Sequence, residues 1–221
     1  MNLNPHFITI EGVDGAGKST HVVKLVKQLK DLGHDVVHTR EPGGTGLGEK
    51  LRALALHAPM SATTETMLMF ASRNEHLEQV IRPALAAGKI VVCDRFTDST
   101  WAYQGGGKGV SDTFLATQEA LVHGDLLPGL TLLFDLPVEI SLQRLIQTGK
   151  TPDKFEAEGR AFHQNVRDSY LRRASDPRFK IVDSSKSIEH IANQVDLILA
   201  GHLPKIHASR AASTRTCPRR S

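Results

Sequence analysis

The stretch that most constrains this 221-residue chain reads GVDGAGKS, from Gly12 to Ser19. It matches the pattern G-x-x-x-x-G-K-[ST], follows an apolar run at residues 7–11 and precedes a helical pattern over residues 18–32. Glycines in this arrangement turn backbone N–H groups toward phosphate oxygens, and the helix adds its positive N-terminal end. The pattern therefore predicts a nucleotide phosphate site made by Gly12, Val13, Asp14, Gly15, Ala16, Gly17, Lys18, Ser19 and Thr20.

Short apolar, β-branched runs alternate with helical patterns along the chain. The predicted strands are residues 7–11, 35–39, 89–94, 130–135 and 179–183. The predicted helices are residues 18–32, 48–57, 65–87, 111–123, 138–147, 156–174 and 188–199. This alternation indicates an α/β fold, with a five-stranded parallel sheet covered by helices on both faces. In such a sheet ligands bind at the carboxyl ends of the strands, and each motif below lies at such an end.

Composition limits the domain organisation. We predict one domain over residues 1–204, and the absence of a long apolar run or a leader-like start favours a cytoplasmic protein without a membrane partner. Residues 205–221 hold five Lys or Arg and no acid, so removing these charges from the formal net charge of +3 leaves −2 on the rest. We therefore predict a basic, disordered tail at residues 205–221, and no nucleic-acid partner.

The phosphate site raises the question of a metal ion. The hydroxyl of Ser19 is placed to bind Mg²⁺, and two predicted strands end in an aspartate, Asp94 and Asp135. Either carboxylate could organise the ion, and Arg95 after Asp94 favours a phosphate-rich setting there. We therefore assign Ser19 and Asp94 to the metal. The guanine-reading N-K-x-D pattern is absent, which disfavours a GTPase.

Three further motifs favour a second nucleotide as phosphate acceptor. They read TREPGGTGLGEKLR (residues 39–52), MLMFASR (residues 67–73) and DRFTDSTWAYQGGG (residues 94–107). Together they supply an aromatic ring, an amide and several guanidinium groups, as a nucleoside monophosphate requires. The residues concerned are Arg40, Pro42, Arg52, Phe70, Arg73, Arg95, Ser99, Tyr103 and Gln104, with a cis peptide bond as one form of the turn at Pro42.

These motifs, in this order, resemble those of bacterial thymidylate kinases over residues 7–199. The resemblance implies the nucleoside monophosphate kinase fold, Mg²⁺, a homodimer and the reaction of ATP with dTMP to give ADP and dTDP. It also implies that Arg73 and Gln104 hydrogen-bond the thymine edge, and that Tyr103 crowds the position of a ribose hydroxyl. The remaining implied roles place Asp14 near the acceptor sugar and phosphate, and Arg40, Arg52, Arg95 and Ser99 around that phosphate.

The spacing between the predicted stacking residue and Arg73 departs from that of some family members. Phe and Arg are often four apart in this helix of the family, whereas Phe70 and Arg73 are three apart. A shift of one residue turns a side chain by about 100° around a helix, which would bring Met69 to the base instead. We favour Phe70, because an aromatic face stacks better than a thioether.

The predicted lid of this chain is unusually short of arginine. Ala16 leaves the phosphate loop without a second basic residue, which implies the style whose cations lie in a lid, at residues 147–159. That segment contains Lys150 and Lys154 but no arginine. We predict that Lys154 contacts the transferring phosphoryl group and that Arg144 assists. The predicted catalytic set is Lys18, Asp14, Arg95, Lys154 and Arg144.

Two other functions fit parts of the sequence. A kinase for another deoxynucleotide or deoxynucleoside would share the phosphate loop and the Asp94-Arg95 strand end, but does not by itself explain TREPGGT together with AYQGGG. An ATP-dependent switch protein would need only the phosphate loop.

Overall fold

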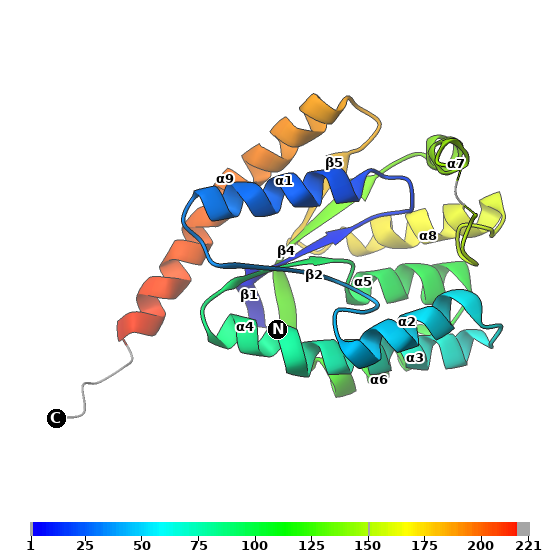
Figure 1. Ribbon diagram of the computed structural model, residues 1–221, viewed down its shortest axis with the longest axis horizontal. Coiled ribbons are helices and arrows are strands. Elements are labelled where there is room, and N and C mark those ends of the chain that lie inside the picture. The colour runs from blue at the N-terminus through cyan, green and yellow to red at the C-terminus, as the bar shows by residue number, and fades with distance from the viewer. Residues whose placement is uncertain (1, 150, 216–221) are drawn as a thin grey trace.

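The computed structural model describes residues 2–149 and 151–215 and shows a parallel sheet between layers of helices (Figure 1). The strands lie in the order β2-β3-β1-β4-β5, and all four neighbouring pairs are parallel. The strands are β1 (Asn2–Glu11), β2 (Val36–Arg40), β3 (Ile90–Asp94), β4 (Leu126–Asp135) and β5 (Phe179–Asp183). The predicted fold class is confirmed.

Helices connect the strands on both sides of the sheet. In Figure 1, α1 and α9 lie on one side, and α3, α4 and α6 lie on the other. The α-helices are α1 (Lys18–Asp31), α2 (Gly46–His57), α3 (Ala62–His76), α4 (Arg82–Ala86), α5 (Thr97–Thr100), α6 (Asp112–Val122), α7 (Val138–Gln147), α8 (Arg160–Arg173) and α9 (Ile188–Arg215). Two π-helical turns, η1 (Leu77–Ile81) and η2 (Trp101–Gly107), interrupt them.

Side-chain alternation along β1 explains why both faces of the sheet are covered. Ile8 and Ile10 belong to the larger core cluster, which also contains Leu25 of α1. Phe7 points to the other face, where it packs in a second cluster with Leu77. Because neighbouring residues of a strand point to opposite faces, an uninterrupted apolar run needs two layers of helices to bury it.

The predicted helix over residues 65–87 is divided in the structure. It forms α3, then η1, and then α4, which carries Pro83 in its first turn. Proline has no N–H, and its ring clashes with the carbonyl of the residue four positions earlier, so a regular helix cannot pass through it. The widened turn η1 lies immediately before α4 and absorbs this mismatch.

The predicted disordered tail is wrong for residues 205–215, because α9 continues through them to Arg215. Residues 216–221 lie outside the described residues. Ile206 is fully buried, and its carbonyl oxygen lies 3.3 Å from Nε2 of His6. The buried side chains Ile191, Val195, Leu199, His202 and Ile206 recur at intervals of three or four residues along α9. The apolar stripe therefore crosses the predicted boundary at residue 204.

We expect Ile206→Ala to lower the free energy of unfolding by about 2–5 kcal/mol, because it removes a fully buried side chain and leaves a cavity. The matched control is Lys205→Ala at the exposed neighbouring position, which should change it by less than about 0.5 kcal/mol. Urea unfolding monitored by circular dichroism measures both. Equal, small effects would show that this part of α9 does not pack on the domain.

Candidate active site

The phosphate loop connects the end of β1 to the start of α1. Gly12 has φ of 138°, and a Cβ at this position would lie 2.4 Å from the carbonyl oxygen of Phe134 on the neighbouring strand β4. No other residue type fits there without displacing the backbone. Lys18 donates to the carbonyl oxygens of Gly12 and Val13, both at 2.9 Å. Burial lowers the pKa of Lys18 to about 8.

Arg95 joins this loop to the segment after β3. Its guanidinium donates to Oδ1 of Asp14 at 2.5 Å and to the carbonyl oxygen of Gly12 at 3.1 Å. The hydroxyl of Tyr103 donates to the other oxygen of Asp14 at 2.6 Å. Burial alone would raise the pKa of Asp14, but Arg95 and Lys18 outweigh it and lower that pKa to about 2. Arg95 has φ of 69°, a strained conformation for a residue with a side chain.

Glu11 is a site residue to which the sequence analysis assigned no role. It is fully buried at the end of β1 and accepts hydrogen bonds from the hydroxyls of Ser99 and Tyr170 and from the backbone N–H of Phe96. Burial, followed by the negative charge of Asp98, raises the pKa of Glu11 to about 7. An acidic residue directly between an apolar strand and a phosphate loop is the sequence signal that marks it.

A cavity beside the phosphate loop gathers most of the residues predicted for the acceptor. Its walls also include Phe155 from the predicted lid. The predicted residues on its walls are Asp14, Pro42, Arg52, Arg73, Arg95, Ser99, Tyr103 and Gln104. Arg40 is outside this set. It lines a second cavity with Ser19 and Asp94, and its guanidinium pairs with Glu49 at 2.8 Å.

The prediction that Phe70 rather than Met69 faces the base is wrong for the geometry of this cavity. Met69 lines it, whereas Phe70 is 1% exposed and absent from its walls. The guanidinium carbon of Arg73 lies 4.9 Å from the centre of the Phe70 ring, so this ring supports the arginine. One residue along α3 turns a side chain by about 100°, and packing decided which side chain faces inward.

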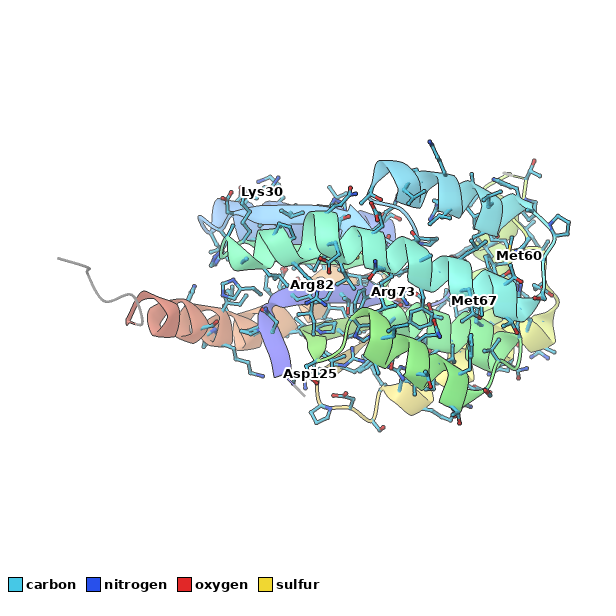
Figure 2. The ribbon with its side chains drawn as sticks, turned by 90° about the horizontal axis from the view of Figure 1, so that it is seen from below. Lys30, Met60, Met67, Arg73, Arg82 and Asp125 are labelled. Atoms are coloured by element: carbon cyan, nitrogen blue, oxygen red, sulfur yellow. The ribbon has the colours of Figure 1, made fainter. Side chains whose placement is uncertain are left out.

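The glycine-rich loop after β2 positions Arg73, which Figure 2 labels on α3. The peptide bond between Glu41 and Pro42 is cis, as the sequence allowed. Glu41 accepts from Nε of Arg73 at 2.7 Å and lies 3.0 Å from Nδ1 of His76. Arg73 also donates to Thr100 at 3.0 Å, while its Nη1 is buried without a hydrogen-bond partner among the described residues. Arg73 thus lines the cavity and has a buried guanidinium nitrogen without a hydrogen-bond partner among the described residues.

Of the two candidate aspartates, Asp94 fits the predicted metal site. Oδ1 of Asp94 is buried and has no hydrogen-bond partner in the described part of the chain, and Asp94 lines a cavity with Ser19. Asp135 is instead held by Arg167, through two hydrogen bonds of 2.7 and 2.9 Å. A carboxylate oxygen without a donor beside a serine hydroxyl provides the oxygen ligands that Mg²⁺ prefers.

Comparison with known proteins shows the family of the chain. The family model for thymidylate kinase matches residues 10–195. The chain belongs to the thymidylate kinase family. The thymidylate kinase of Cupriavidus taiwanensis is 54% identical over 199 residues, which cover 88% of this chain and 97% of that protein. The thymidylate kinase of Pseudomonas putida is 52% identical over 204 residues, covering 90% and 97%. That of Bordetella pertussis is 53% identical over 198 residues, covering 89% and 95%.

The lid of this thymidylate kinase family member differs from the sequence expectation. Arg144, near the end of α7, donates to the carbonyl oxygen of Gly15 in the phosphate loop at 3.3 Å. Lys154 instead forms an ion pair with the buried carboxylate of Glu65 at 2.5 Å, and also contacts the carbonyl of Ala58 and the ring of Phe155. The structure therefore does not bring Lys154 to the phosphate loop, because a buried carboxylate attracts its ammonium group. Lys150 lies outside the described residues.

None of the helices in the described part of the chain has the length and apolar character that crossing a membrane requires.

We expect Glu11 to make the protein less stable as the pH rises from 5 to 7. With a pKa raised from 4.5 to about 7, the folded state binds more protons than the unfolded state in this window, so the free energy of unfolding falls with pH. Glu11→Gln removes this titration, so the free energy of unfolding should fall less between pH 5 and pH 7 than in the unaltered protein. Urea unfolding at these two pH values measures the difference. Glu189→Gln, at an exposed position, is the control. An unchanged pH dependence in Glu11→Gln would show that Glu11 is ionised throughout.

Proposed function

We propose that this chain transfers the γ-phosphoryl group of ATP to dTMP, giving ADP and dTDP for dTTP synthesis. The observation that carries the proposal is the unpartnered Nη1 of Arg73, buried at a cavity that also contains Asp14 and Arg95. An unsatisfied buried donor costs about 1–3 kcal/mol, which a pyrimidine carbonyl would recover by accepting from it. The named activity of the relatives in three bacterial species supports the same assignment.

The donor nucleotide binds at the phosphate loop. Lys18 leaves the carbonyls of Gly12 and Val13 and turns to the β- and γ-phosphates, whose charge favours its protonated form. The backbone N–H groups of Gly15 and Gly17 and the first turn of α1 hold the remaining oxygens. The full donor set is Gly12, Val13, Asp14, Gly15, Ala16, Gly17, Lys18, Ser19 and Thr20.

Mg²⁺ would be held by Ser19 and, directly or through water, by Asp94, and when bound it neutralises phosphate charge. Its placement rests on the free Oδ1 of Asp94.

The acceptor phosphate needs positive charge more than a general base, since a phosphate monoester is already an anionic nucleophile near pH 7. Arg95 provides that charge between the two nucleotides, with Arg52 and Ser99 beside it. Arg40 instead lines the second cavity, together with Ser19 and Asp94. Tyr103 stands against the acceptor sugar, where its ring leaves no room for a ribose hydroxyl. Met69 takes the position at the base that we had assigned to Phe70.

A homodimer is consistent with the surface of α3 and α6, which lie beside each other (Figure 2). Met67 on α3 is 51% exposed, and Leu121 on α6 is 78% exposed. We propose that a second copy of the chain covers these side chains, in the homodimer that the family resemblance implies. Sedimentation of the protein over a range of concentrations measures the state, and a persistent monomer would refute the proposal.

We expect the purified protein, with ATP and Mg²⁺, to release ADP in a dTMP-dependent manner in a coupled assay. The acceptors to compare are dTMP, dUMP, dCMP and thymidine, with Lys18→Met as the inactive control. A clear preference for another acceptor would establish the alternative kinase function. ATP hydrolysis that no acceptor stimulates would favour the switch protein, and the absence of turnover with every nucleotide would contradict the kinase assignment.

We expect Arg144→Ala to lower kcat by at least about tenfold, because Arg144 is the lid-border cation that contacts the phosphate loop. Lys154→Ala should lower kcat less, since its ammonium pairs with Glu65. Arg160→Ala is the matched control, because Arg160 is exposed and pairs with Glu139 on the surface. Steady-state kinetics at saturating ATP and dTMP measure all three. A larger loss in Lys154→Ala than in Arg144→Ala would restore the original assignment of Lys154.

A further inference from the structure

Glu65 is a fully buried carboxylate that the proposed reaction does not use. It lies in the first turn of α3 and has no solvent exposure. Its Oε1 accepts from the side-chain amide nitrogen of Gln104 at 2.9 Å. Its Oε2 pairs with Lys108 at 2.9 Å and with Lys154 at 2.5 Å. Three donors from the segments around the cavity therefore converge on one carboxylate.

The two lysines explain how the charge is tolerated. A buried carboxylate is costly unless it is paired, and removing a partner from such a group is strongly destabilising. Both ammonium groups also lie near the ring of Phe155, at 4.7 Å for Lys108 and 5.4 Å for Lys154. Because both occupy Oε2, Oε1 remains for the amide of Gln104.

An ionised carboxylate accepts hydrogen bonds and donates none, so the group that Gln104 turns toward Glu65 has to be its NH₂. The amide is planar, and its carbonyl oxygen therefore points the other way. Gln104 lines the acceptor cavity and is 2% exposed, and no donor among the described residues hydrogen-bonds that carbonyl oxygen. Glu65 thus turns the carbonyl oxygen of Gln104 away from itself, in a residue that lines the same cavity as Arg73, whose Nη1 has no partner among the described residues.

This pair of groups has a definite chemical preference. A carbonyl acceptor suits a ring that carries N3–H, as thymine and uracil do, and opposes cytosine, whose N3 is itself an acceptor. The Nη1 donor of Arg73 suits a carbonyl at C4 and opposes the amino group of cytosine. A site built to hydrogen-bond one pattern strongly rejects the complementary one.

We propose that Glu65 is a positioning residue that sets base specificity, by holding Gln104 with its carbonyl oxygen toward the acceptor base. The inference rests on the proposed phosphorylation of dTMP. It assigns the discrimination between thymine and cytosine to a carboxylate that does not touch the substrate. In Glu65→Gln the oxygen remains attractive to the two lysines, and the new NH₂ faces Gln104, which turns its own carbonyl away from the base.

The experiment compares kcat/KM for dTMP and dCMP in the unaltered protein, Glu65→Gln and Glu65→Asp. We expect Glu65→Gln to lower the dTMP-to-dCMP ratio by at least about tenfold, chiefly through the KM of dTMP. Glu65→Asp keeps an acceptor-only group and should preserve the preference better than Glu65→Gln does. Glu78→Gln, at an exposed position of the same helical segment, should leave the ratio unchanged. A ratio in folded Glu65→Gln within twofold of the unaltered value would overturn the inference.

A second comparison separates positioning from a general structural role. If Glu65 acts through Gln104, then Glu65→Gln should lower the ratio much less in a Gln104→Leu background than alone. Equal losses in both backgrounds would show that Glu65 acts by another route. If the unaltered protein does not phosphorylate dTMP at all, the proposed function fails, a result distinct from an unchanged ratio in an active enzyme.

A further measurement needs no variant at Glu65 and no enzymatic activity, so it tests the inference even if Glu65→Gln does not fold. The side-chain NH₂ of Gln104, assigned in ¹⁵N–¹H spectra by its loss in Gln104→Leu, should exchange slowly with solvent deuterium, because the group is buried against Glu65. Exchange at the rate of a free glutamine would overturn the inference.

Discussion

The ion pair between Asp14 and Arg95 is the constraint on which the rest of the site depends. Ile10 and Asp94 are paired in register on the neighbouring strands β1 and β3, so the two loops that follow these strands leave the sheet side by side. The phosphate loop supplies Asp14 and the segment after β3 supplies Arg95, and their contact fixes the phosphate loop against the cavity that both residues line. Arg95 holds a strained backbone conformation for this purpose.

Buried charges hold the acceptor cavity in shape from several sides. Glu41 fixes Arg73 from the loop after β2, and Glu65 is bound by groups from η2 and the lid. Buried ion pairs often add little net stability, because desolvating the charges costs about as much as their attraction returns. We therefore interpret these carboxylates as fixing the direction of hydrogen-bond donors and acceptors. That is the property a site needs if it is to distinguish bases whose edges present different patterns of hydrogen-bond donors and acceptors.

The sequence predicted the fold, the phosphate loop and most of the residues around the acceptor cavity, because these depend on short-range patterns. The predictions failed where packing decides the neighbours of a side chain. Met69 rather than Phe70 faces the cavity, and Lys154 meets Glu65, which is distant in sequence. The tail was misjudged for a different reason, since its composition is polar while one buried residue, Ile206, continues the stripe of α9.

The sequence by itself determined the succession of strands and helices along the chain and the place of the phosphate loop, since hydrophobic periodicity and glycine spacing are local properties. Only the tertiary structure decided which charged groups meet. Glu11 hydrogen-bonds Ser99 and Tyr170, and Glu65 pairs with Lys108 and Lys154. These partners are far apart in the sequence, so no local pattern predicts them. Buried charges must find partners wherever the fold places them, and the identity of those partners follows from packing.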